Sequence, residues 1–221
     1  CDAVALAQVD GPEIEIVDGA GNLKWGLQAT ERYITINDLA IHSFGNGWFI
    51  YDNANLLVRG GGGYFEAFNM VLGSEAHQDM APAGSDINGA PNFQALGVDD
   101  GKFHHNYVAY GSTMGGFLRT GCANWEVYQN DFAHNGLVDQ ITDGLDVADF
   151  TENCVVKENL FRNNGANGLD TYNSHGGHQI ENNTSYNNGR LGNETSGMRI
   201  YGGYGDTITK NLIYDNVGAG I

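Results

Sequence analysis

Residues 156–189 read VKENLFRNNGANGLDTYNSHGGHQIENNTSYNNG and contain one pattern twice. An apolar residue stands three positions before an Asn, and an Asn-Asn-Gly corner follows that Asn after four or five positions. The Asn residues in this frame are spaced by 24, 29, 24 and 28 positions: Asn106, Asn130, Asn159, Asn183 and Asn211. The apolar residues before them are Phe103, Val127, Val156, Ile180 and Ile208. A period of this length with strand-like alternation indicates a stacked solenoid.

One Asn per repeat has a physical reason. Stacked coils lie about 4.8 Å apart, so each amide can hydrogen-bond the amide of the next coil inside a buried turn. The predicted fold is therefore all-β: a right-handed parallel β-helix of about seven to eight coils with an Asn ladder, formed by residues 1–221 as a single domain. The right-handed sense follows from the general chirality of parallel crossovers.

The same frame extends toward the N-terminus. Asn37, with Ile34 three positions before it, is predicted to lie in the ladder, and Gly60 or Gly61 is predicted to fill the next rung. Residues from about 71 to 101 then form one long inserted loop, either a lid or substrate wall or an excursion without function. The last residues match the start of another coil, so we expect the C-terminal coil to be incomplete or uncapped. Such an end suits head-to-tail stacking or a longer chain.

The composition favours a protein outside the cell. The formal net charge is −17, with only 10 Lys and Arg, which makes nucleic acid and anionic membranes poor partners. No apolar run is long enough to form a transmembrane segment. We expect an extracellular or cell-surface protein. Cys1 would suit the lipid-carrying cysteine of a lipoprotein. Cys122 and Cys154 fall at different ladder positions, so core packing is favoured over a disulfide.

Candidate functional residues follow from the strand after each corner. The segments TDGLDVADF, ANGLDTYNS and SGMRIYGGY occupy equivalent places in three coils. If their apolar residues point inward, Asp146, Asp170 and Arg199 point outward in one column. Arg119 joins this column one coil earlier if Leu118 points inward. A purely structural face can also carry such a column, because opposite charges in neighbouring coils stabilise each other modestly.

Neighbouring residues favour a functional column. Tyr172 and Tyr201 match in register, with His175 and His178 just beyond them, and aromatic and imidazole groups suit sugar recognition. Further carboxylates lie near the column: Asp139, Asp143 and Asp149. Calcium prefers six to eight oxygen ligands, but no contiguous calcium-loop motif is present. A calcium site would therefore be assembled across coils.

Residues 163–203 resemble the active-site region of the family 9 polysaccharide lyases, which belong to the pectate-lyase-like β-helix enzymes. That family shows a DDGLD segment, then IENC-x-A and NG, then GNGFK and GG. The resemblance implies that Asp170, with Asp146 or Asp143 one coil earlier, binds Ca²⁺, and that Arg199 stands where the family has its Brønsted base Lys. Here the first two acids of DDGLD are Ala166 and Asn167.

The resemblance implies a polysaccharide lyase that cleaves an acidic, uronate-containing polysaccharide by β-elimination with the help of calcium. Arg199 is then either the base or a clamp on a substrate carboxylate, in which case Tyr201, Tyr172 or His175 moves the proton. Arg119, His175 and His178 are the predicted substrate-binding residues. A uronate C5-epimerase shares the first chemical step. The alternative from another class is a non-catalytic β-helix that acts as a cell-surface, fibre or glycan-binding module.

Overall fold

The computed structural model describes residues 14–17, 25–30, 33–42, 54–59, 63–73, 91–111, 113–136, 143–190 and 195–221. Cys1, Gly60, Gly61 and Asp139 lie outside these ranges. The described residues form strands joined by turns and bends, and their strands pair in parallel within three sheets. Among them there is no helix long and apolar enough to cross a membrane. The predicted all-β solenoid is confirmed.

Each sheet holds one strand from every coil. The first sheet has eight strands: β1 (Ile14–Val17), β4 (Leu39–His42), β7 (Val71–Leu72), β10 (Tyr107–Ala109), β13 (Asp131–Ala133), β16 (Leu160–Arg162), β19 (Thr184–Tyr186) and β22 (Leu212–Tyr214). The second sheet has seven: β2 (Trp25–Ala29), β5 (Ala54–Arg59), β8 (Phe93–Leu96), β11 (Gly116–Arg119), β14 (Leu145–Val147), β17 (Leu169–Tyr172) and β20 (Met198–Tyr201). The third sheet also has seven: β3 (Ile34–Asn37), β6 (Phe65–Phe68), β9 (Gly101–His104), β12 (Glu126–Tyr128), β15 (Val155–Lys157), β18 (Gln179–Glu181) and β21 (Thr207–Thr209).

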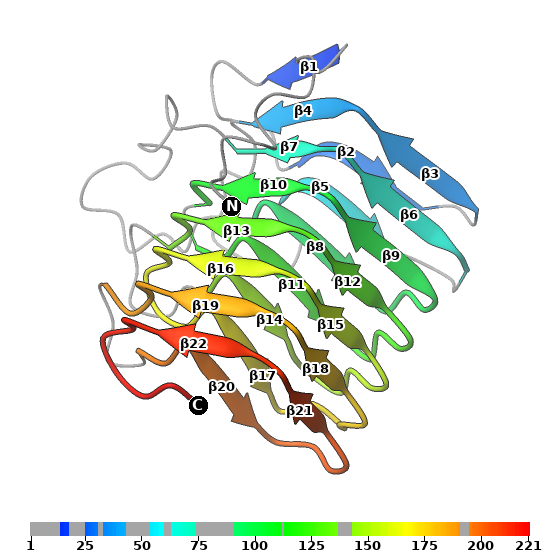
Figure 1. Ribbon diagram of the computed structural model, residues 1–221. Helices are drawn as coiled ribbons and strands as arrows, with labels where there is room; N and C mark the ends of the chain where they lie inside the picture. Colours follow the sequence, from blue (N-terminus) through cyan, green and yellow to red (C-terminus); the bar gives the residue numbers. More distant parts are fainter. Residues whose placement is uncertain are drawn as a thin grey trace.

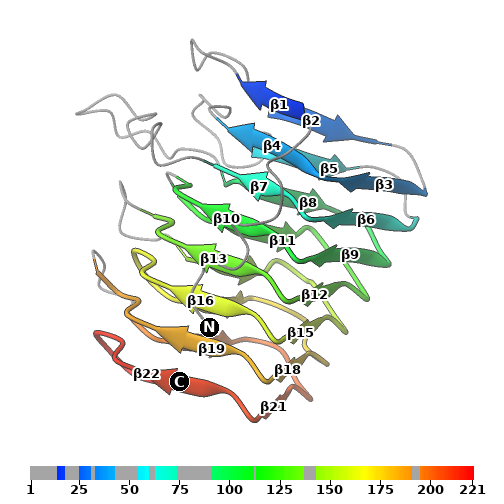
Figure 2. The ribbon, with the colours of Figure 1, turned by 45° about the horizontal axis from the view of Figure 1, so that its top comes forward.

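The chain runs through the second, third and first sheets in turn and then starts the next coil. Figure 1 shows the resulting stack, with the strands of each sheet lying one above another from blue to red. Figure 2 shows the same succession of coils from a tilted view. About seven coils are present, and residues 23 to 37 positions apart become neighbours in space. Side chains at equivalent positions therefore form columns along the helix axis.

The predicted Asn ladder is present at the corner between the third and first sheets. Each side-chain amide donates to the amide oxygen of the next coil, over distances of 3.0 to 3.1 Å, from Asn106 through Asn130, Asn159 and Asn183 to Asn211. Its second hydrogen goes to a backbone carbonyl of the preceding coil, as from Asn159 to Val127 at 2.8 Å. Buried amides are thus satisfied without water.

A second Asn ladder lies at the corner between the first and second sheets, and the sequence reading treated these residues only as turn formers. Its amides are joined over distances of 2.9 to 3.2 Å and belong to Asn135, Asn164, Asn188 and Asn216. Glycines just before three strands of the second sheet make room for it: Gly115, Gly144 and Gly197. A Cβ on Gly144 would lie 2.8 Å from Asn164 Nδ2 and 2.5 Å from the carbonyl oxygen of Gly168.

The predicted apolar stack is confirmed from Phe103 onward. The third sheet pairs the residues of this stack directly with one another: Phe103, Val127, Val156, Ile180 and Ile208. The prediction that Ile34 continues the stack is wrong by two residues. Ile36 pairs with Ala67, and Ala67 pairs with Phe103.

The same shift corrects the N-terminal end of the ladder. Asn37 is exposed and pairs with Phe68, so it does not lie on a ladder rung. Met70 occupies the position before Asn106, and its backbone N–H donates to Asn106 Oδ1 at 2.9 Å. A buried methionine needs no polar partner at that corner, which is why the Asn pattern stops there.

The predicted insertion over about 71 to 101 is also too long. Residues 71–73 and 91–101 belong to regular coils, with β7 and β8 paired on both sides. Only residues 74–90 of that range lie outside the described residues. The sequence reading missed β8 because its strand, FQAL, lies in a stretch of the sequence that shows no sustained period.

Candidate functional site

The outward column predicted on the second sheet is confirmed from Asp146 to Arg199. Asp146 pairs with Asp170, and Asp170 pairs with Arg199 in the next coil. Leu145, next to Asp146 in the chain, is fully buried in the core. Alternation along β14, β17 and β20 therefore brings these charged side chains together outside the core.

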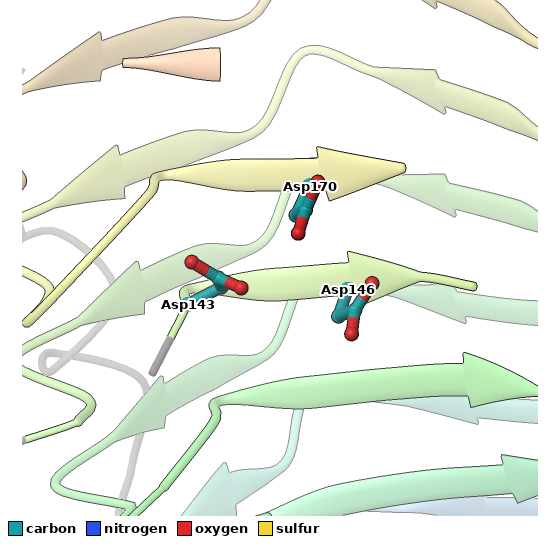
Figure 3. Close-up of side chains that lie close together, drawn as sticks. All are labelled: Asp143, Asp146 and Asp170. Atoms are coloured by element: carbon teal, nitrogen blue, oxygen red, sulfur yellow. The ribbon is translucent and has the colours of Figure 1, made fainter. Parts of the chain in front are cut away.

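Three carboxylates converge at this column. One oxygen each from Asp143, Asp146 and Asp170 lies within 4.8 Å of the other two. Figure 3 shows Asp143 just before β14, Asp146 within β14, and Asp170 on the neighbouring strand β17. The segment between Asp143 and Asp146 is Gly-Leu, so Leu145 enters the core while both acids stay outside it. We call these three residues the Asp cluster.

The Asp cluster is buried and incompletely hydrogen-bonded. Its three residues are 1%, 5% and 1% exposed, in chain order. Asp143 Oδ1 accepts a hydrogen bond of 2.7 Å from the backbone N–H of Asn167, but Asp143 Oδ2 and Asp146 Oδ1 are buried with no hydrogen-bond partner. Orphaned buried polar oxygens are rare in proteins and call for a proton, water or ion.

Burial and mutual repulsion alter the acidity of the cluster. Burial, and then the charge of Asp170, raise the pKa of the Asp143 carboxyl to about 8. The pKa of Asp146 is raised well above its usual value, chiefly by burial and next by Asp170 and Asp143. Both carboxyls therefore favour the neutral form unless a cation compensates their charge.

Arg199 supplies one positive charge to the cluster. Its Nε donates to Asp170 Oδ1 at 2.9 Å, and its Nη2 donates to Asp170 Oδ2. Three carboxylates and one guanidinium leave a formal charge of −3 + 1 = −2, which a divalent cation would neutralise. Two oxygens on one calcium ion, at the usual 2.3 to 2.6 Å, are at most about 5 Å apart. The residues present therefore fit a calcium ion with three protein ligands.

Arg119 does not join the column as predicted, because the register differs by two residues. Phe117 pairs with Asp146, and Leu118 points inward but pairs with Val147. Arg119 is largely buried, forms an ion pair with Asp149 and lies 4.4 Å above the centroid of the Phe117 ring. Asp149, a candidate ligand from the sequence, is thus engaged by Arg119 outside the Asp cluster.

Tyr172 and Tyr201 occupy the outward position two residues beyond the column. Their rings stack at 5.5 Å between centroids and 11° between planes, and both side chains are about half exposed. The guanidinium carbon of Arg199 is 5.9 Å from the centroid of the Tyr172 ring. His175 is exposed in the following turn and contacts Phe150 at 5.2 Å between ring centroids. Tyr172 therefore lies beside Arg199, two positions along β17 from Asp170.

His178 lies elsewhere. It is 1% exposed, and its Nδ1 accepts a hydrogen bond of 3.2 Å from the backbone N–H of Cys154. It occupies the position equivalent to the buried core residue Cys154, just before the third sheet. The structure therefore does not bring His178 to the candidate site.

Two features of the site were missed from the sequence. The backbone N–H of Asn167 donates a hydrogen bond to Asp143. The sequence pattern that could have predicted this contact is that both residues stand three positions before an outward Asp. Phe117 continues the charged column with an aromatic ring, packed with Met114 and Ala148 in a small cluster of its own. No spacing rule in the sequence predicted that the column changes from charged residues to an aromatic residue at Phe117.

The comparison with protein-family models agrees with the fold. A family model described as "Right handed beta helix region" matches residues 25–193 and confirms the right-handed sense predicted from the sequence. No curated protein matches the chain. A solved structure of pectate lyase Pel9A aligns with a TM-score of 0.46 and 15% identity, over 99% of this chain and 58% of that one. The chain thus spans less than two thirds of the length of that structure.

Proposed function

We infer a function from two observations. The chain belongs to the family of right-handed β-helix regions. Its second sheet carries the Asp cluster beside Arg199. We propose that it is a polysaccharide lyase, acting outside the cell on an acidic polysaccharide that contains uronates. The observation that supports this most is the pair of buried, unpartnered oxygens on Asp143 and Asp146.

The Asp cluster would hold calcium through Asp143, Asp146 and Asp170. A bound calcium ion would withdraw electron density from a substrate carboxylate and so acidify the neighbouring C5 proton. A calcium ion there would also reduce an electrostatic obstacle, because a protein of net charge −17 repels a polyuronate unless the negative charge of the binding face is neutralised.

In β-elimination, a base takes the C5 proton of the uronate and the electron pair forms a C4–C5 double bond. The C4–oxygen bond breaks, and the leaving oxygen takes a proton from water. Arg199 is bound to Asp170 by two hydrogen bonds, which favour the charged guanidinium. It is therefore better suited to neutralise a substrate carboxylate than to act as the base. Tyr172 and Tyr201, exposed beside it, are the candidates for proton transfer.

The direct test screens polygalacturonate, alginate and rhamnogalacturonan for the ultraviolet absorbance of an unsaturated product, with calcium and with chelator. Asp146→Asn should abolish calcium-dependent turnover. Asp215→Asn is the matched control, since Asp215 is exposed at a left-handed corner where equivalent coils carry Asn163 and Asn187.

The other outcomes separate the rival functions. Exchange of the C5 proton without an unsaturated product would indicate a uronate C5-epimerase. Calcium-dependent binding of a polysaccharide without either reaction would indicate a glycan-binding module. The proposal would be contradicted if the protein neither bound nor altered any of these polymers.

A further inference from the structure

The third sheet carries a histidine held in a fixed orientation on its outer face. The ring of His104 lies between the rings of Phe68 and Tyr128, at centroid distances of 5.1 and 4.5 Å and interplanar angles of 2° and 10°. The parallel register places these three residues directly one above another. Because both faces of the imidazole are covered, its ring cannot rotate without disrupting the stack.

The two nitrogens of His104 have different partners. Nε2 lies 3.1 Å from Glu66 Oε1, and Nδ1 lies 2.8 Å from Nδ1 of His105. A carboxylate can only accept, so Nε2 carries a hydrogen, and in the neutral ring Nδ1 of His104 then accepts a hydrogen bond from Nδ1–H of His105. A metal ion bound between the two nitrogens would replace that proton. Glu66 is itself fixed by a hydrogen bond from Tyr64. A carboxylate that orients a histidine in this way is the usual outer partner of a metal-binding imidazole.

His105 is the exposed half of the pair. It occupies a left-handed corner, with φ of 55°, and its ring stands nearly perpendicular to that of His104. Its exposure gives an ion a path from solvent.

We propose that His104 and His105 form a binding site for a divalent transition-metal ion that prefers tetragonal coordination, copper(II) first and nickel(II) next. Metal–nitrogen bonds of about 2.0 to 2.1 Å at an angle of about 90° place two cis nitrogens about 2.9 Å apart, and a tetrahedral angle places them about 3.4 Å apart. The observed 2.8 Å matches the first value. Copper(II) binds such nitrogen ligands more tightly than the other divalent ions of its row.

This site is separate from the Asp cluster in position and in chemistry. It lies on the third sheet, whereas the Asp cluster lies on the second, and it offers nitrogen ligands where the cluster offers only oxygen. Hard ions such as calcium choose oxygen, and imidazole suits copper and nickel. The proposal therefore stands whether or not the chain is a lyase.

The test is titration of copper(II) into the whole chain, followed by electron paramagnetic resonance, with Cys1→Ser in every sample to remove a thiol that would compete for copper. The unaltered pair should bind one copper ion with coupling to two imidazole nitrogens. His105→Asn should lose one nitrogen coupling and bind copper at least about tenfold more weakly. Asn suits the left-handed corner, so this variant keeps its backbone conformation.

His134→Asn is the matched control, because His134 also occupies a left-handed corner, with φ of 56°, and stacks on Tyr110. It should leave copper binding unchanged. Glu66→Gln should weaken binding about tenfold, since it removes the charge that orients His104. The proposal is overturned if the unaltered pair binds no copper at micromolar concentration, if only one nitrogen couples to it, or if His105→Asn binds copper as tightly as before.

Discussion

The guanidinium of Arg199 holds both carboxylate oxygens of Asp170, its neighbour one coil earlier. A calcium ion at the Asp cluster would share Asp170 with this guanidinium. Because Asp170 would then neutralise Arg199 less completely, Arg199 should attract an added anion. A uronate carboxylate is such an anion. Under the proposed function, this one residue would neutralise an internal acid before substrate binds and a substrate acid afterwards.

Substitution of Arg199 should separate a clamp from a base. We expect Arg199→Lys to raise KM about tenfold while changing kcat less, because Lys cannot form the planar two-point contact. Arg199→Ala should abolish measurable turnover. Steady-state kinetics on the active polymer provide the measurement. Arg162→Lys is the control, since Arg162 makes an equivalent two-point contact with Asp131 on the first sheet. A Lys variant with unchanged KM would instead support the base.

Calcium should stabilise the protein more at high pH than at low pH. The pKa of Asp143 is about 8 in the folded chain, against about 3.9 for an unfolded Asp. A raised carboxyl pKa means that stability is highest at low pH and falls as pH rises from about 4 to about 8. Calcium replaces the proton, so its effect on Tm should grow across that window. Calorimetry at pH 5 and pH 8 is the measurement, and Asp143→Asn should flatten the difference. A calcium effect of equal size at both pH values would exclude Asp143 as a ligand.

Removal of one ladder amide should be costly. Asn159→Ala removes the side-chain acceptor of Asn130 Nδ2 and the side-chain donor to Asn183 Oδ1, and we expect a loss of about 1 to 3 kcal/mol in the free energy of unfolding. Urea denaturation measures it. Gln179→Ala, an exposed change on the third sheet, should stay within about 0.5 kcal/mol. Equal stability of the two variants would show that the ladder amides contribute no net free energy.

A methyl group at the start of β14 should disturb the second ladder. In Gly144→Ala, the new Cβ would meet the Gly168 carbonyl oxygen and Asn164 Nδ2, and we expect a loss of about 1 to 3 kcal/mol. Gly220→Ala is the control, because its Cβ would meet only Ile213 Cγ2, at 3.7 Å. The comparison again uses urea denaturation. An undiminished midpoint for Gly144→Ala would mean that the corner can widen without loss.

The sequence was sufficient to predict the fold wherever a buried polar side chain can form its hydrogen bonds in only one way. Asn106 to Asn211 must pair with one another, so their spacing fixes the coils and the register of the strands between them. The same reasoning placed Asp146, Asp170 and Arg199 correctly. It failed at Asn37 because an exposed Asn in a strand has the same local frame as a buried one. Only the pairing of β3 with β6 distinguishes them.

The site was predictable in its acids and less so in its surroundings. Asp143, Asp146 and Asp170 follow from alternation and register alone. Arg119 was misplaced because no Asn-Gly corner precedes β11, which begins at Gly116. Without that corner, the sequence does not fix which residue of β11 pairs with Asp146. The burial of His178 depends on the core position of Cys154, which the periodic pattern does not reveal.

The spacing between ladder residues varies between 24 and 29 while every rung stays joined. Residues can therefore be gained or lost at the corners of a coil without changing which strands are neighbours. Exchange of whole coils is different, because Asp143 and Asp146 come from one coil and Asp170 and Arg199 from the next two. A duplication between them would preserve both ladders and separate the charges. Evolution can thus lengthen this protein at either side of the site more freely than through it.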